Sequence, residues 1–195
     1  MLDLYEGYSY LHGVMRRVEE LLVAIAGELG RGMTITYNGH TIDLTPPWRR
    51  ITMRDAILQA TGIDYQAYPD ARALAAAMSA AGLRPEQTLA RGKLIDQLFG
   101  DHVEPTLVQP TFILDYPVEI SPLAKKKADD PTTVERFEYF IGGLECGNAF
   151  TELNDPIDQR ARFVELREAV AGADENSHPL DEDFLNALAY GMPPT

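Results

Sequence analysis

The chain has 195 residues, 45% of them hydrophobic, which is enough to bury one core and predicts a single compact domain. Its net charge of -13 argues against a broad nucleic-acid-binding face and against binding to an anionic membrane surface. The longest apolar run, residues 21–26, is too short to cross a bilayer, and the first residues lack a signal-peptide pattern, so we expect no membrane and a cytoplasmic location.

The N-terminal half is expected to be mainly helical. Apolar residues recur every three or four positions from Tyr10, which predicts an amphipathic helix ending near Gly27 or Gly30. Asn38-Gly39 lies between two short β-prone runs and predicts a hairpin. Capping residues, alanine content and glycine stops predict further helices over residues 53–62, 70–81 and 86–99, the last one stopping at Gly100.

A strand, a loop and a second hairpin follow. The stretch "TFILDYPVEIS" predicts a buried strand that reaches Pro117. Residues 121–133 are polar and rich in lysine and proline, which predicts a mobile loop. The stretch "FEYFIGGLECGNAFTELND", residues 137–155, then predicts a hairpin that turns at Gly142-Gly143.

Two helices are expected to end the chain. Asp155 and Pro156 are typical of an N-cap and a first helical position, and this helix would run to about Ala173. Asp181 is expected to cap a last helix that ends near Gly191. Because helices and hairpins mix without a regular strand-helix alternation, the pattern favours an α+β fold with an antiparallel sheet.

The second hairpin carries unusual charge for a strand pair. With a two-residue turn, the directly opposed pairs are Ile141 with Leu144, Phe140 with Glu145, and Glu138 with Gly147. Glu138 and Glu145 then become diagonal neighbours on one face. Two carboxylates this close repel unless a cation or proton lies between them, and such a pair suits magnesium with a phosphate-bearing ligand. The alternative is a pair of exposed glutamates on a solvated face.

A second polar set follows in the same strand. Asn148, Phe150 and Glu152 alternate with small residues, which places an amide, a ring and a carboxylate on one side. Such a set could bind an ammonium group whose methylene stem packs on the ring. Strict alternation puts this set opposite the glutamate pair, so we predict a bulge near Gly147 that brings both sets to one pocket. The alternative is an edge strand with a polar outer face.

Four stretches of the chain together resemble class II lysyl-tRNA synthetases. "MLDLYEGYSY" is similar to the tail of motif two, "PTFILDYPVEISPLAKK" to the strand and loop before the hairpin, "FEYFIGGLECGNAFTELNDP" to the hairpin itself, and "LAYGMPPT" to the lead into motif three. The resemblance implies an antiparallel β-sheet flanked by helices, with residues 1–195 as a partial, incomplete class II catalytic domain without an anticodon-binding domain. It also implies activation of lysine by ATP to lysyl adenylate and transfer of the lysyl group to tRNA(Lys).

The resemblance further implies roles for individual residues. Glu138 and Glu145 would bind Mg2+ that bridges the phosphates of ATP. Five residues would form the lysine pocket: Glu152 and Tyr5 at the ε-ammonium, Asn148 and Phe150 beside them, and Asp3, which stands where the family usually has glutamate.

The cysteine of the hairpin and the three lysines of the preceding loop are not assigned to either binding site. Cys146 falls on the opposite parity to Glu145 and is interpreted as a small core residue rather than a nucleophile. Lys125, Lys126 and Lys127 would approach ATP phosphates or RNA if their loop closed, or else form a solvated loop.

We assign no catalytic residue, because the arginines that the family uses in motifs two and three have no counterpart in this sequence. Losing such clamps costs orders of magnitude in rate, so we expect the isolated chain to be a poor catalyst or none.

Three functional hypotheses follow. The chain is a catalytic-core part of a lysyl-tRNA synthetase, which uses lysine, ATP and tRNA(Lys) and is a homodimer at full length. Alternatively, it is a synthetase-like ligase that attaches an amino acid to a protein. A third possibility is a non-catalytic module that binds lysine or a nucleotide, in which the pocket persists without turnover.

Overall fold

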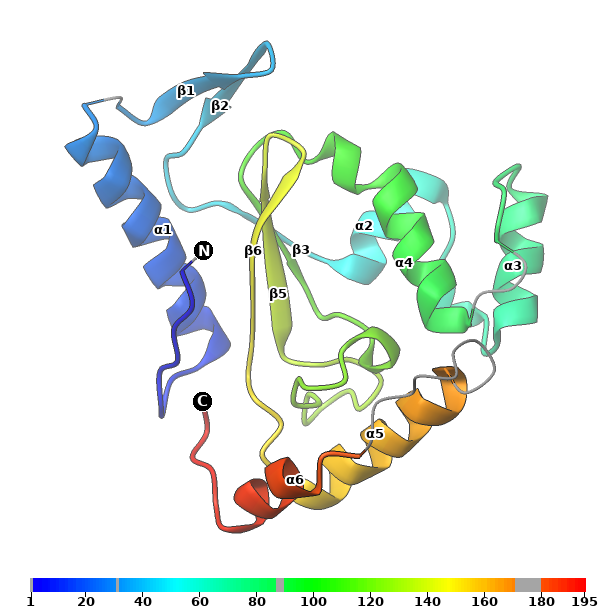
Figure 1. Cartoon of the computed structure of the whole chain (residues 1–195). Coiled ribbons are helices and arrows are strands. Elements are labelled where there is room, and N and C mark those ends of the chain that lie inside the picture. Colours follow the sequence, from blue (N-terminus) through cyan, green and yellow to red (C-terminus); the bar gives the residue numbers. More distant parts are fainter. Residues whose placement is uncertain (1, 31, 87–89, 171–179) are drawn as a thin grey trace.

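The computed structural model describes residues 2–30, 32–86, 90–170 and 180–195 (Figure 1). Its helices are α1 Leu11–Glu28, α2 Met53–Thr61, α3 Ala71–Ala80, α4 Arg91–His102, α5 Pro156–Val170 and α6 Glu182–Ala189. Its strands are β1 Thr34–Tyr37, β2 His40–Asp43, β3 Arg49–Thr52, β4 Thr111–Leu114, β5 Arg136–Ile141 and β6 Leu144–Phe150. No helix of these described parts has the length and apolar character needed to cross a membrane.

The central sheet has four strands in the order β3-β4-β5-β6. The β4–β5 and β5–β6 pairs are antiparallel, whereas β3 pairs with β4 in parallel. The predicted α+β fold with an antiparallel sheet is confirmed, except that this one strand pair is parallel. The reason is the connection: α2, α3 and α4 lie between β3 and β4 in the chain, and such a crossover joins parallel strands.

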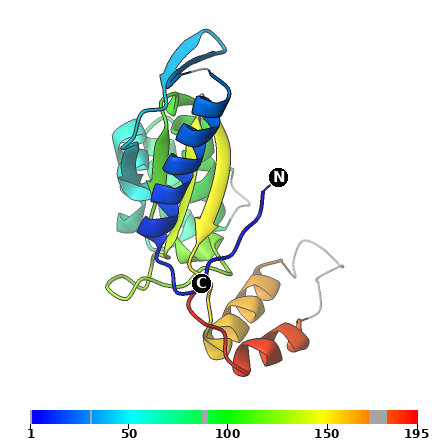
Figure 2. The same ribbon diagram turned by 90° about the vertical axis from the view of Figure 1, so that its left-hand side faces the viewer.

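Helices cover both faces of this sheet. On one face, α2, α3 and α4 build a core against β4 and β5, with Ile57, Leu94 and Phe140 fully buried. On the other face, α1 packs Met15 against a second cluster that includes Phe137. Figures 1 and 2 show α1 on one side, the α2–α4 group on the other, and α5 with α6 at one end of the sheet. The alternation along β5 therefore points Phe137 to α1 and Phe140 to α4.

Local sequence signals explain most of the element boundaries. Asn38 and Gly39 have φ angles of 47° and 80°, which confirms the predicted tight hairpin between β1 and β2. The Asp155 carboxylate accepts a hydrogen bond from the Ile157 amide at 2.8 Å, and the Asp181 side chain caps α6 in the same way. Both predicted starts of the C-terminal helices are confirmed, while the predicted end near Ala173 lies outside the described residues.

Three predicted boundaries are wrong. Gly100 lies inside α4, which continues to His102, because packing of this helix on the core outweighs the weak helix propensity of one glycine. The helix begins at Arg91 rather than at Glu86, although residues 87–89 lie outside the described parts. The buried strand ends at Leu114 instead of Pro117, because Asp115 adopts a positive φ of 58° that breaks the extended backbone.

The β5–β6 hairpin contains the predicted bulge. Phe140 pairs with Glu145, as expected, but the next pair is Tyr139 with Gly147, which leaves Cys146 as the extra residue. The bulge replaces the expected Glu138–Gly147 pair by Glu138 with Asn148, and Asn148 thereby joins the face of Glu138. The interpretation of Cys146 as a core residue is wrong, because this unpaired bulge residue has an exposed side chain.

Glycine is required at Gly147 but not at Gly100, and this contrast predicts opposite stability changes. A Cβ at Gly147 would lie 2.4 Å from Tyr139 Cε1, whereas one at Gly100 would meet no atom of the described residues within 4 Å. We expect Gly147→Ala to lower the free energy of unfolding by about 1–3 kcal/mol through overpacking. The control Gly100→Ala should raise it by about 0.5–1 kcal/mol. Urea unfolding measures both, and equal effects of the two changes would contradict the observed register.

Candidate functional site

A small pocket lies where the N-terminal segment meets the edge strand β6. Its volume is about 130 Å³, and its lining comes from residues 3–14, from residues 148–152 and from Thr195. The lining includes all five residues predicted to bind lysine, namely Asp3, Tyr5, Asn148, Phe150 and Glu152. Two segments from opposite ends of the chain thus contribute to one site, as Figure 1 shows for the blue N-terminal segment beside β6.

The pocket has an acidic lining. Among its described residues are the carboxylates Asp3, Glu6 and Glu152, and no lysine or arginine. Glu6 forms an ion pair at 2.5 Å with Arg17, which is not part of the pocket lining. The Glu152 side chain is half-buried, and this burial raises the pKa of its carboxyl. A desolvated carboxylate of this kind favours an incoming cation, because the cation offsets the cost of burial.

The glutamate pair lies on the face of β5 and β6 that is turned toward α4. Glu138 is buried, and its two carboxylate oxygens accept hydrogen bonds from the Tyr116 hydroxyl at 2.8 Å and from Arg136 at 2.5 Å. Burial raises the pKa of Glu138, and the nearby charge of Glu145 adds to this effect, while Tyr116 and Arg136 oppose it. Glu145 itself is exposed. The effect of the Glu145 charge on the pKa of Glu138 therefore agrees with the predicted proximity of the two carboxylates.

The pair offers an incomplete magnesium site. In the part of the chain that the structure describes, no group of three or more His, Cys, Asp or Glu side chains could hold a metal ion. Each Glu138 oxygen accepts one hydrogen bond and keeps a second lone pair, and the exposed Glu145 carboxylate is accessible. Two carboxylates suit Mg2+ when phosphate oxygens and water supply the other ligands. These residues therefore fit the ion only together with a phosphate-bearing ligand.

Arg136 connects the glutamate pair to the acidic pocket. Its guanidinium contacts Glu138, donates to Asn148 Oδ1 at 3.2 Å and to two oxygens of residues 120–121 at 2.9 Å. Its Cζ also lies 4.6 Å from the centre of the Tyr116 ring. Sequence reasoning did not select this residue, although it precedes Glu138 by two positions and must share its face.

The lysine-rich loop is held by neighbouring residues. Lys125 donates to Asn154, Lys126 pairs with Asp158, and Lys127 pairs with Asp115, at 3.2, 3.0 and 2.8 Å. Backbone bridges join Ala124 to Glu152 and Lys126 to Val134. The expectation that the three lysines are simply solvated is therefore wrong, because their acceptors come from segments that are distant in sequence. None of the three ammonium groups is directed to the glutamate pair in this arrangement.

The whole chain is similar in sequence to proteins of one known family. The family described as "tRNA synthetases class II (D, K and N)" matches residues 1–195. The chain is 52% identical to a lysine–tRNA ligase of Chloroflexus aurantiacus, 48% to one of Roseiflexus castenholzii and 50% to one of Moorella thermoacetica, each over 195 residues. Each match covers 100% of this chain and 40% of the relative, so the chain spans about 40% of the length of these curated proteins.

Proposed function

The chain belongs to the class II tRNA synthetases of the D, K and N group, and from this membership we propose that it serves lysine activation. The reaction condenses lysine with ATP to lysyl adenylate and then transfers the lysyl group to tRNA(Lys). Residues 1–195 would form part of the catalytic domain of a lysyl-tRNA synthetase, which acts in the cytoplasm as a homodimer. The observation that carries the proposal is the acidic pocket, which gathers three carboxylates, an amide and three aromatic rings at one strand edge.

The pocket suits lysine among the amino acids that this group activates. Glu152 would pair with the ε-ammonium, Phe150 would pack against the methylene stem, and Asn148 would supply an oriented hydrogen bond. Tyr5 would hold the ε-ammonium together with Glu152, and Asp3 would add a further carboxylate to the pocket. Aspartate is disfavoured here, because a carboxylate substrate would be repelled by the acidic lining.

The neighbouring glutamate pair suits the second substrate. Glu138 and Glu145 would hold Mg2+ against the phosphates of ATP, and the ion would offset phosphate charge and orient the nucleotide. Arg136 would keep the Glu138 carboxylate ionised and orient it, and would orient Asn148 through the same guanidinium. The two substrates would thus lie on one face of the hairpin, which the bulge at Cys146 makes possible.

The test is amino-acid-dependent exchange of labelled pyrophosphate into ATP. It should be run on this chain and on a longer polypeptide of the same length as the lysine–tRNA ligases. We expect lysine to support exchange in the longer polypeptide, and little or no exchange in the 195-residue chain. Exchange with aspartate or asparagine in place of lysine would contradict the proposal. Absence of exchange in both proteins, combined with lysine binding, would favour a non-catalytic binding module.

A further inference from the structure

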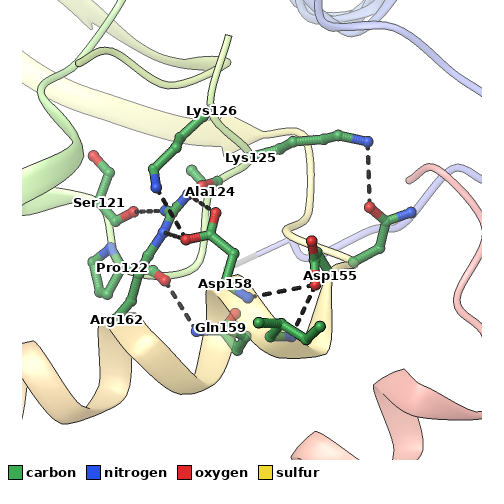
Figure 3. Close-up of polar contacts among 11 residues, drawn as sticks. Ser121, Pro122, Ala124, Lys125, Lys126, Asp155, Asp158, Gln159 and Arg162 are labelled. Carbon is green, nitrogen blue, oxygen red and sulfur yellow. Dashed lines mark hydrogen bonds and ion pairs between the residues drawn. The ribbon is translucent and has the colours of Figure 1, made fainter. Parts of the chain in front are cut away.

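The first half of α5 carries a buried cation. The Arg162 side chain is 5% exposed, and its guanidinium donates to both carboxylate oxygens of Asp158, one turn earlier in the helix, at 3.3 and 3.0 Å. The same guanidinium donates to the backbone oxygens of Ser121 and Ala124 at 3.1 and 2.5 Å (Figure 3). Four acceptors therefore surround one planar group, a geometry that a guanidinium matches and an ammonium does not.

A second buried side chain of α5 extends this contact. Gln159 is 1% exposed and donates to the Pro122 backbone oxygen at 3.1 Å. Backbone oxygens of residues 121–124 are thus held at three points by two side chains of one helix (Figure 3). Because buried polar groups are costly when their partners are removed, this set of contacts strongly restricts the loop.

The restrained loop in turn pairs with the end of the hairpin. Leu153 donates its amide to the Leu123 oxygen at 2.9 Å, and Lys125 donates to the Thr151 oxygen at 2.8 Å. Ala124 lies opposite Glu152 in this short antiparallel bridge. The backbone that carries Glu152 is therefore positioned by the loop.

Glu152 depends on this backbone support. Among the described residues, the hydrogen bonds of its carboxylate include none from another side chain, and the cause of its raised pKa is burial. The amide of Glu152 does donate to the Thr195 oxygen at 2.9 Å. Since side-chain partners do not orient the carboxylate, the backbone position of residues 151–153 decides where it enters the pocket.

We infer that Arg162 is a positioning residue for lysine recognition, which acts through residues 121–124 on Glu152 without contacting lysine. The inference rests on the proposed function, because it assumes that Glu152 binds the ε-ammonium. A displacement of about 1 Å at a binding group can cost about 100-fold in rate, so loss of the guanidinium contacts should be measurable at the lysine site.

The experiment compares Arg162→Lys with Arg160→Lys in the longer polypeptide. Arg160 lies on the same helix, but its exposed side chain pairs with Glu182 at the surface, so it is a matched control. We expect Arg162→Lys to raise the KM for lysine about tenfold, with the KM for ATP unchanged. The preference for lysine over norleucine, which lacks the ammonium group, should fall by the same factor. Hydrogen exchange at the amides of Lys125 and Leu153 should become faster.

The outcomes separate the inference from the proposed function. If the unmodified protein does not recognise lysine, the proposed function fails, and the inference fails with it. If it recognises lysine and Arg162→Lys matches Arg160→Lys in lysine KM and amide exchange, the inference alone is overturned. If Arg162→Lys does not fold, Gln159→Met supplies the same test, because it removes one loop contact and keeps the size of the side chain. An unchanged lysine KM in that variant would equally overturn the inference.

Discussion

Replacing Glu152 by glutamine is expected to weaken lysine binding by roughly 10- to 100-fold. A hydrogen bond between charged groups contributes about 1.5–3 kcal/mol, and about 1.4 kcal/mol corresponds to a factor of ten in affinity. The amide of glutamine keeps the shape of the side chain but loses the charge that attracts the ε-ammonium. Calorimetric titration with lysine measures the change, and equal affinities of the two proteins would contradict the assigned role.

Two comparisons make this result specific to Glu152. Glu6 lines the same pocket but already pairs with Arg17, so Glu6→Gln should change lysine affinity much less. Lysine binding should also weaken as the pH falls, because Glu152 becomes protonated while the ε-ammonium of lysine stays charged. Burial raises the pKa of Glu152, so this decline should begin at a higher pH than for an exposed glutamate. Glu152→Gln should lack this dependence.

Replacing Arg136 by methionine is expected to destabilise the fold by roughly 3 kcal/mol, near the lower end for breaking a buried ion pair. The lower end applies because the Arg136 and Glu138 side chains keep 16% and 12% exposure. Without the guanidinium, the Glu138 carboxylate keeps the Tyr116 hydroxyl as a hydrogen-bond partner but has no paired cation among the described residues. Urea unfolding measures the stability, and binding of Mg-ATP should weaken in parallel.

A double-mutant cycle isolates the Arg136–Glu138 interaction. The variant that combines Arg136→Met with Glu138→Gln should lose less stability than the sum of the single changes, because no uncompensated charge remains. The exposed control Arg160→Met should have little effect.

The pH dependence of stability gives a second test of the same pair. Burial raises the pKa of Glu138 in the folded protein, so its ionisation lowers the free energy of unfolding as the pH rises through that pKa. The deficit of Arg136→Met should therefore shrink at low pH, and an additive cycle would contradict the pairing.

Local chemistry made the hairpins and most helix starts predictable. Asn38-Gly39 and Gly142-Gly143 turn where expected because few other dipeptides accept positive φ angles at both positions, and all four residues have them. Asp155 and Asp181 cap helices through hydrogen bonds within a few residues. The end of α4 was missed, because the effect of Gly100 is smaller than the packing of the whole helix.

Pairing geometry together with the family resemblance also anticipated much of the candidate site. Alternation placed Asn148, Phe150 and Glu152 together, and the glycine at 147 indicated the bulge that the register contains. The same alternation identifies the shared face of Arg136 and Glu138, although it says nothing of their contact. Tyr5 and Asp3 entered through the resemblance alone, since no local rule connects the start of the chain to β6.

The sequence by itself determined the turns, the caps, the bulge and the order of side chains on each face, because these depend on neighbours within a few residues. Only the tertiary structure decided the parallel β3–β4 pair, the exposure of Cys146 and the partners of Lys125–Lys127. It also decided that Arg136 contacts both Glu138 and Asn148. The contacts of Arg162 with the backbone oxygens of residues 121–124 likewise depend on the tertiary structure. These contacts join segments that are distant along the chain, and their energies depend on burial that exists only once the core has formed.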